Sequence, residues 1–374
     1  MTRTPAEVFG PGEFIRDELE ERGWTQSDLA TILDRPLSAV NQIINGKKSI
    51  TPDTARELAE AFDTSAELWL NLEASYRLSE SKDPHGSVRE RAKLFEQAPV
   101  SEMQRRGWIG SAKDPASIRT ELLRFYDVGN EQELANSRDR IAARKQDADE
   151  PLSPAQFAWF RRIQQLSASV QAKAYSKKAV DDGLPALREL AANPEEIRRA
   201  PAILADMGIR LVVVEHLSKT KVDGVAFRIS PKKPVIGLSL RYDRIDYFWF
   251  TLFHELGHIY LEHVDPPIDD DLQASAKDES REQIEQEADA FAADRLVPGE
   301  QIESFILRKQ PLFSKKSIIQ FANKVRVHPG LVVGQLQYRD KIKYSHSREM
   351  LVKVRDHLVD STITDGWGRQ PSLS

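Results

Sequence analysis

Hydrophobic residues recur at helical spacing, in short blocks, from residue 11 to residue 78. Each block is bounded by residues that cap or break helices, for example Thr25 and Thr51. This pattern predicts a compact bundle of short helices, a domain that we place at residues 1–80. The polar segment SESKDPHGS at 79–87 contains Pro and Gly and predicts a linker.

Two further patterns follow the linker. Helical spacing without a chemical motif continues over 88–150 and predicts a helical connector. From residue 155 more helical segments precede β-branched runs at 209–240, which are separated by the turn sequence SPKKP and predict two or three strands with a hairpin. An apolar segment at 247–261 comes next. We therefore expect an α+β domain over 155–345 and a C-terminal tail at 346–374.

Composition narrows the chemistry. The 374 residues are 40% hydrophobic and 30% charged, which is ordinary for a folded chain of more than one domain. Cysteine is absent, so thiolate nucleophiles and cysteine zinc sites are excluded and any metal must be held by His, Asp or Glu. We find no stretch apolar enough to span a bilayer and no secretory signal, and therefore expect a cytoplasmic protein with no membrane partner. The net charge of -5 provides no general attraction to nucleic acid.

The apolar segment YFWFTLFHELGHIYL contains the candidate catalytic residues. On a helix, His254 and His258 lie one turn apart on the same side, so both imidazoles can reach one ion. Glu255 lies about 100° around the helix, where it can take a proton from a metal-bound water. The rest of the segment is apolar, so we expect a buried helix in which a divalent cation satisfies these polar groups. The alternative is a surface helix or a hydrogen-bonded pair of core histidines.

A catalytic zinc site needs a third protein ligand, which we expect from the next helix, REQIEQEADAFAADRLVP. In that helix Glu287 falls at the edge of an apolar face, whereas Glu285 points toward the polar side, so Glu287 is the predicted ligand. Asp294, two turns further on the same side, is a candidate to hold a ligand histidine by its free N–H. The alternative for Glu287 is a half-buried carboxylate without a metal. The residues that define the apolar face are Ile284, Ala288, Phe291 and Ala292.

Three blocks in this part of the chain carry a resemblance to a known family: RYDRIDYFWFTLFHELGHIYLEH, EQEADAFAADRLVP and FANKVRVHPGLVVGQLQ. Through them the stretch from Ile203 to Gln337 resembles the ImmA/IrrE family of bacterial metallopeptidases. The resemblance implies a zincin-like α+β domain with its third zinc ligand at the Glu before Ala-Asn or Ala-Asp, here Glu287, and with Asp289 where Asn is common. Members of that family cleave or otherwise inactivate transcriptional repressors, so a regulatory protein is the expected substrate.

The segment GWTQSDLATILDRPLSAVNQIINGKKSIT has the pattern of a helix-turn-helix unit, with two short helices joined by a tight turn at 34–36. The second helix of such a unit enters the major groove. The expected core residues are Leu29, Ala30, Leu33, Val40, Ile43 and Ile44. We expect base contacts from Ser38, Asn41 and Gln42, and phosphate contacts from Gln26, Lys47 and Lys48.

Residues 11–78 also resemble the HigA-type antitoxin branch of the Cro/C1 (XRE) helix-turn-helix regulators, through PGEFIRDELEERGWTQSDLA, VNQIINGKKSITPDTARELAEAF and TSAELWLNLEASY. The resemblance implies a five-helix, lambda-repressor-like domain that forms homodimers, binds operator DNA, represses transcription and restrains a cognate toxin in a toxin-antitoxin system. The alternative is a protein-interaction module of the same fold.

These patterns predict a multidomain, mainly α protein with an α+β part, in which a DNA-binding regulator also hydrolyses a peptide bond with Zn²⁺ as cofactor. We expect the substrate peptide to add as a strand along 222–229, beside the metal. The rival hypothesis is a non-enzymatic HigA-like antitoxin or repressor whose zinc domain is structural, metal-sensing or toxin-binding. Glu255 argues against that rival, because a structural zinc site needs no general base.

Overall fold

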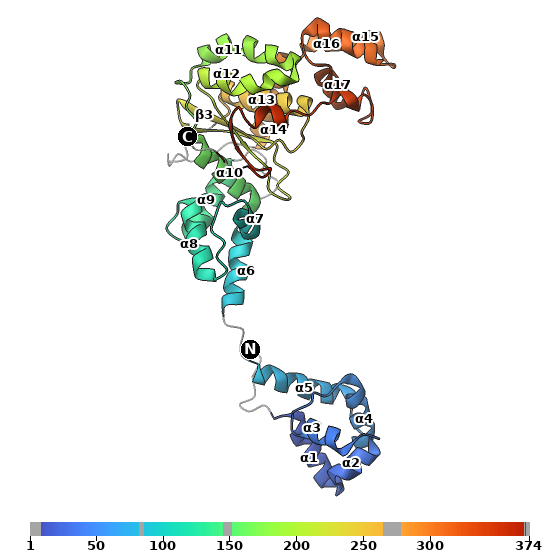
Figure 1. The fold of residues 1–374 in the computed structure, drawn as a ribbon. Helices are drawn as coiled ribbons and strands as arrows, with labels where there is room; N and C mark the ends of the chain where they lie inside the picture. The colour runs from blue at the N-terminus through green and yellow to red at the C-terminus, as the bar shows by residue number, and fades with distance from the viewer. Residues whose placement is uncertain (1–8, 82–85, 145–151, 265–277, 370, 372–374) are drawn as a thin grey trace. The chain divides into compact units, whose positions relative to one another are not determined.

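The computed structural model of this chain divides into two compact units, Met1–Arg89 and Glu90–Ser374. It describes residues 9–81, 86–144, 152–264, 278–369 and 371 (Figure 1). These residues are mainly helical, with one small sheet in the second unit. Within the described ranges, we find no helix with the length and hydropathy needed to cross a membrane.

The first unit contains the five predicted helices around one apolar core. Thr25 begins the second helix in a capping box with Asp28, and the Thr51 hydroxyl accepts a hydrogen bond from the Thr54 N–H at the start of the fourth. All six core residues expected of the helix-turn-helix are buried, which confirms that part of the prediction. The helices are α1 (Pro11–Arg22), α2 (Gln26–Ile32), α3 (Leu37–Ile44), α4 (Pro52–Phe62) and α5 (Ala66–Glu80).

The segment predicted as a separate connector belongs to the second unit, and that prediction is corrected. Its aromatic residues share one core with the strand at 210–214 and with α10 (Pro154–Ser167). Trp108 donates from Nε1 to Asp365 at 3.0 Å, and the Arg106 guanidinium donates to two backbone carbonyls at 2.7 and 2.8 Å. Long-range contacts of this kind have no signature in local spacing. The connector helices are α6 (Ser87–Gln97), α7 (Val100–Arg105), α8 (Pro115–Tyr126) and α9 (Glu131–Arg144).

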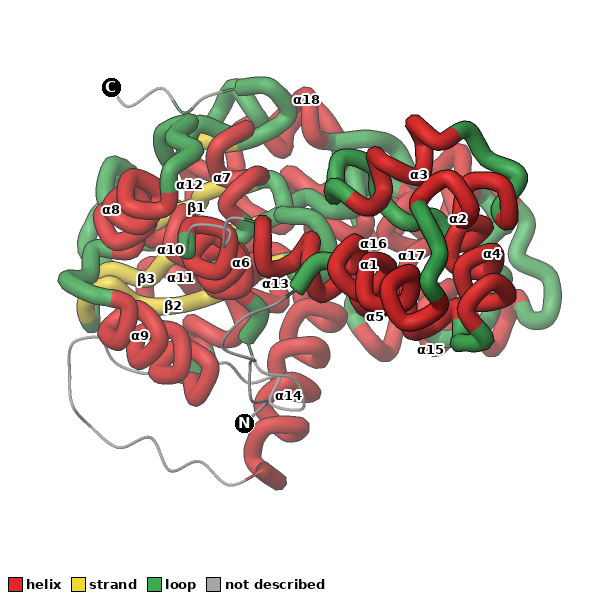
Figure 2. The backbone as a smooth tube through the Cα atoms, turned by 90° about the horizontal axis from the view of Figure 1, so that it is seen from below, coloured by secondary structure: helices red, strands yellow, loops and turns green. Residues whose placement is uncertain are grey.

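The sheet has the strand order β2-β3-β1-β4. β2 (Gly224–Ser230) and β3 (Lys233–Leu238) form the predicted antiparallel hairpin, while β1 (Arg210–Val214) runs parallel to β3 and β4. Figure 2 shows β1, β2 and β3 in yellow, side by side. β1 is buried throughout, as expected for a β-branched run covered on both faces. β4 (Ile363–Asp365) comes from the predicted C-terminal tail, so the prediction of a separate tail is wrong.

Helices cover both faces of the sheet. α11, α12 and α13 share one apolar core on one face, and α10 packs on the other (Figure 1). α14 packs along α13, and the remaining helices extend the same core. The α-helices are α11 (Lys177–Glu189), α12 (Ala200–Asp206), α13 (Ile245–Tyr260), α14 (Asp278–Leu296), α15 (Gly299–Lys309), α16 (Lys315–Val325), α17 (Pro329–Tyr338) and α18 (Arg355–Leu358). Short 3-10 helices lie at Leu190–Ala192, Pro194–Arg199 and Arg348–Met350.

Candidate metal centre and nucleic-acid interface

α13 is a buried helix, as its all-round apolar sequence predicts. Glu255 and His258 are buried within it, and His254 is partly buried. The close approach of α14 is made possible by Gly257, where a Cβ atom would lie only 3.3 Å from the Ala288 Cα and 3.2 Å from the Phe291 ring. Small residues at this crossing bring acidic side chains of α14 over the two histidines.

Three donor groups converge at this crossing. The Nε2 atoms of His254 and His258 are 3.0 Å apart, and the Glu285 carboxylate oxygens lie 3.2 Å from the first and 3.5 Å from the second. Tetrahedral zinc with ligand distances of about 2.0–2.2 Å would place its donor atoms about 3.3 Å apart. Two imidazoles and one carboxylate are also a donor set of catalytic zinc. The geometry therefore fits zinc, and among the described residues these three form a group that can hold a metal ion.

Asp289 holds the first of these donor groups, the His254 imidazole, in position. Its Oδ1 lies 2.8 Å from Nδ1 of His254, which directs the Nε2 atom toward the other donors. Burial alone would lower the pKa of His254, but hydrogen bonds with Asp289 and Glu285 outweigh burial and raise that pKa to about 10. Burial alone would raise the pKa of Glu285, but hydrogen bonds with His254 and His258 outweigh it and lower that pKa to about 2. The cluster thus attracts positive charge, which a metal ion can supply in place of the proton.

The Glu255 side chain projects from α13 toward Gly224, at the start of β2. A Cβ atom at Gly224 would lie 2.5 Å from Glu255 Oε1, so only glycine leaves room for the carboxylate there. Burial raises the pKa of Glu255 to about 7, although His254 and His258 act in the opposite direction. A carboxyl group with that pKa can both accept and release a proton near neutral pH.

The structure corrects the predicted third ligand. Glu287 is 45% exposed and contacts His263 at 3.1 Å and Gln283 at 2.8 Å, whereas Glu285 faces the histidines. The buried line on α14 runs through the small residues Ala288 and Ala292, and Glu285 lies one turn before Ala288 on that line. Ile284 and Phe291, which the spacing places on the same apolar face as the alanines, are only partly buried. The small-residue stripe facing Gly257 is the signal that would have identified Glu285.

The predicted supporting role of Asp294 is also corrected. Its Oδ1 accepts a hydrogen bond from the Gly299 N–H at 3.0 Å, so it caps the start of α15. Asp289, four residues after Glu285, makes the histidine contact predicted for Asp294.

The residues predicted to contact DNA come from α2, α3 and the segment that follows α3. Ser38 and Gln42 are exposed on α3, Asn41 is partly buried between them, and their spacing places all three on one helical face. Asn41 Oδ1 is buried and has no hydrogen-bond partner among the described residues. Lys47 and Lys48 are exposed just after the helix, and Gln26 is the partly buried first residue of α2.

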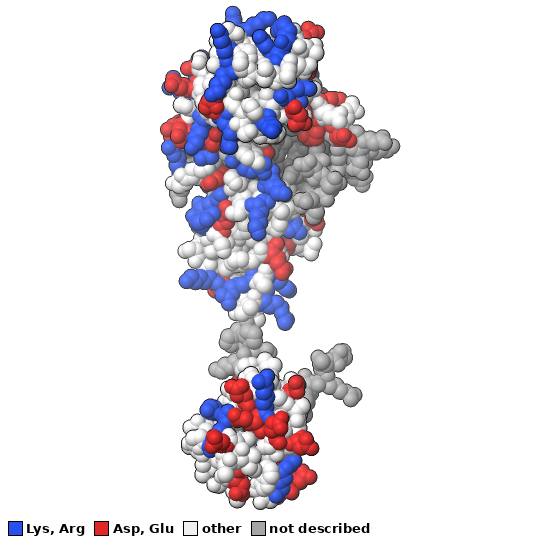
Figure 3. Space-filling model, turned by 90° about the vertical axis from the view of Figure 1, so that its right-hand side faces the viewer, with Lys and Arg blue, Asp and Glu red and all other residues white. Residues whose placement is uncertain are grey.

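The positive charge around α3 is smaller than the sequence indicates. Arg35 forms a two-contact ion pair with Glu57 at 2.6 and 3.1 Å, which leaves the two lysines as the cations nearest to α3 in sequence. The face of this unit in Figure 3 also carries several acidic side chains. A weak positive field favours contact with particular bases over general attraction to phosphate.

Comparison with protein families assigns both units. A family model described as Helix-turn-helix matches residues 15–69, and one described as IrrE N-terminal-like domain matches residues 206–332. An uncharacterized HTH-type transcriptional regulator of Haemophilus influenzae is 43% identical over 74 residues, which are 20% of this chain and 66%, slightly under two thirds, of the relative. Virulence-associated protein A of Dichelobacter nodosus is 36% identical over 85 residues, which are 22% of this chain and 80% of the relative.

Similar solved structures include the Pseudomonas aeruginosa antitoxin HigA with the higBA promoter, at 37% identity, 20% coverage of this chain, 82% of that chain and a TM-score of 0.19. A HigA-family antidote protein of Coxiella burnetii is 32% identical and covers 25% of this chain and 96% of that chain, with a TM-score of 0.19. By the family matches and the curated relatives, the first unit is a helix-turn-helix domain of the regulator type, and the second contains a peptidase-family domain. The chain belongs to the XRE-type helix-turn-helix family through its N-terminus, joined to an IrrE-like domain.

Proposed function

We propose that the second unit is a zinc-dependent endopeptidase. The observation that carries this proposal is the convergence of His254, His258 and Glu285 next to the buried carboxyl of Glu255. A structural zinc site would be closed by four protein ligands, whereas three ligands leave a position for water. The IrrE-like family match over the same residues supports the proposal.

Zinc, when bound, would polarise both the attacking water and the scissile carbonyl. Glu255 accepts the proton of that water and passes it to the leaving amine, a role that suits its raised pKa. Asp289 is a positioning residue, because it keeps the Nδ1 side of His254 bonded and the Nε2 side directed at the metal. Burial of α13 limits competing solvent around these groups.

The edge of the sheet supports a binding mode for the substrate. β2 is the outer strand in the sheet of the described residues. Ser239 donates from its N–H to the Asp223 carbonyl at 2.9 Å, so the backbone groups of Asp223 face β3. Along an antiparallel strand every second residue bonds to the same neighbour, so the N–H and C=O of Ala226, three residues later, point away from β3. Pro234, which has no N–H, pairs with Arg228, and the same alternation makes this a pair without hydrogen bonds between β2 and β3. We infer that a substrate peptide adds to this edge as a further strand.

We further propose that the first unit binds operator DNA as a homodimer, with Ser38, Asn41 and Gln42 at base edges and Gln26, Lys47 and Lys48 at phosphates. The exposed face of α3 and the match to helix-turn-helix regulators support this. The protein would act in the cytoplasm, where its DNA lies. Its peptidase substrate would be a repressor or another regulatory protein, and a cognate toxin would be a second partner.

Zinc analysis combined with a cleavage assay tests the enzymatic proposal. The full chain should contain one zinc, cleave a pool of unstructured peptides, lose cleavage on chelation and regain it when zinc is restored. His258→Ala should lose both zinc and cleavage. Chelator-resistant cleavage, or a full equivalent of zinc in His258→Ala, would refute the assignment.

A further inference from the structure

An apolar pocket lies next to the candidate metal centre, along the same face of α13. Tyr247 and Phe250 precede His254 by seven and four residues, so the three side chains follow one helical stripe. Four residues rise about 6 Å along a helix. The Phe250 and His254 ring centroids are 6.2 Å apart, so one aromatic ring separates the pocket from the metal ligands.

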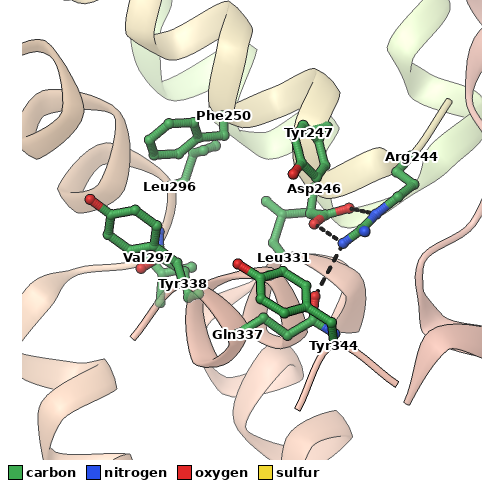
Figure 4. Close-up of a pocket in the computed structure, with 12 residues that line it drawn as sticks. Arg244, Asp246, Tyr247, Phe250, Leu296, Val297, Leu331, Gln337, Tyr338 and Tyr344 are labelled. Atoms are coloured by element: carbon green, nitrogen blue, oxygen red, sulfur yellow. Dashed lines mark hydrogen bonds and ion pairs between the residues drawn. The ribbon is translucent and has the colours of Figure 1, made fainter. Parts of the chain in front are cut away.

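The pocket has the size of a large side chain. Its volume is about 170 Å³. An apolar cavity of about 150 Å³ is sufficient to bind benzene. Leu296, Val297 and Leu331 form buried parts of its lining, and in Figure 4 aromatic rings from α13, α17 and the following loop surround the open space. Two of these rings, Tyr338 and Tyr344, are 68% and 62% exposed, so the part of the pocket that they line is accessible to solvent.

The charged groups of the pocket are already paired with one another. Arg244 donates to both carboxylate oxygens of Asp246, at 3.0 and 2.6 Å, and to Gln337 Oε1 at 3.2 Å (Figure 4). A charged ligand would have to break this network or lose its own hydration without compensation. An apolar side chain needs neither, because the rest of the lining is aromatic and aliphatic apart from Gly334 and Gln335, and Gln335 Oε1 already accepts a hydrogen bond from Arg339 Nε at 3.4 Å.

We propose that this pocket binds an aromatic or large aliphatic side chain of the substrate, at a residue within about two positions of the cleaved bond. The inference rests on the proposed function, because it takes the scissile bond to lie at the metal centre. The Phe250 ring, which forms the near wall of the pocket, has its centroid 6.2 Å from that of the His254 ring, and an extended peptide advances about 3.4 Å per residue, so about two residues reach this wall from the metal ligands. The pocket thereby determines the preferred cleavage sequence.

Two chelating probes test the pocket without any need for hydrolysis. N-acetyl-L-phenylalanine hydroxamate and N-acetyl-L-alanine hydroxamate share one zinc-binding group and differ only in a benzyl or methyl side chain. Calorimetry on the zinc-loaded full chain should give at least about tenfold tighter binding of the phenylalanine probe. Val297→Phe, which fills the pocket, should reduce this ratio to below about threefold while the alanine probe binds as before.

A second pair of variants covers the case in which Val297→Phe fails to fold. Tyr338→Ala should reduce the phenylalanine preference several-fold, whereas Leu307→Ala should not, since Leu307 is 72% exposed and lies outside the pocket. Equal affinity of the two probes for the wild-type chain, or no binding of either, would overturn the proposal. A phenylalanine preference without peptide cleavage would support the pocket and refute the peptidase. Peptide cleavage without a preference between the two probes would support the peptidase and refute the pocket.

Discussion

Replacing Glu285 and Glu287 in turn by Gln separates the proposed metal ligand, Glu285, from its near neighbour Glu287. Glu285 lies within 3.5 Å of both histidines, whereas Glu287 contacts His263 and Gln283 outside the donor group. Loss of a group that only supports a ligand typically costs about 10- to 100-fold in metal affinity. Loss of the ligand itself should cost at least about 100-fold, or about 2.7 kcal/mol. Exposed contacts such as those of Glu287 contribute about 0–1 kcal/mol, so Glu287→Gln should change the affinity by less than about fivefold.

Competition between the protein and a chromophoric zinc chelator measures both affinities on one scale. The two side chains are 39% and 45% exposed, so both variants should fold, and circular dichroism would verify this. Glu287→Gln is therefore a control matched in position, exposure and charge change. The reasoning is refuted if Glu287→Gln releases zinc while Glu285→Gln retains it.

Three further predictions concern DNA, substrate and pH. Gln42→Ala should cost about 1–3 kcal/mol of binding free energy on an operator selected from genomic fragments and little on random DNA. Lys47→Ala should weaken binding to both DNAs and flatten the salt dependence of the affinity, and gel shifts over a salt series measure these effects. Ala226→Pro should lower kcat/KM by about two- to tenfold without changing zinc content or Tm, since only an outward N–H is lost. The control Val225→Pro removes an N–H that faces β3 and should lower Tm. Unchanged cleavage by Ala226→Pro would exclude the added strand. Zinc affinity should rise about tenfold per pH unit between about pH 7 and 9, because His254, with its pKa raised to about 10, must release a proton to bind the metal. In the metal-free protein, the stability that the ion pairs of His254 contribute is present below about pH 6.5 and is lost as pH rises through about 10. A flat affinity above pH 7 would contradict that pKa.

Local patterns were sufficient where one helix or hairpin contains the whole signal. The two histidines and Glu255 lie on a single helix whose apolar surroundings predict burial, and the β2–β3 hairpin follows from alternation around a turn. The helix-turn-helix core likewise follows from spacing within residues 25–44. In each case the contacts that matter are close in sequence.

The remaining features depend on packing between distant segments. Which acid of α14 faces His254 and His258 is decided by the crossing at Gly257, because helices approach most closely where side chains are smallest. β4 is too short to stand out in sequence, and its pairing with β1 joins residues about 150 positions apart. The connector helices gain their core from the sheet, through aromatic residues whose partners lie far along the chain.

Cleavage by zinc-loaded Glu255→Gln protein, compared with wild type at equal zinc content, tests the central claim most directly. The amide is nearly isosteric with the carboxylate but cannot accept the proton of the attacking water. We predict an unchanged single equivalent of zinc, an unchanged Tm and a rate on the peptide pool reduced by about 10²- to 10⁴-fold. A Glu255→Gln protein that holds zinc and cleaves peptides at the wild-type rate would contradict the proposed peptidase mechanism.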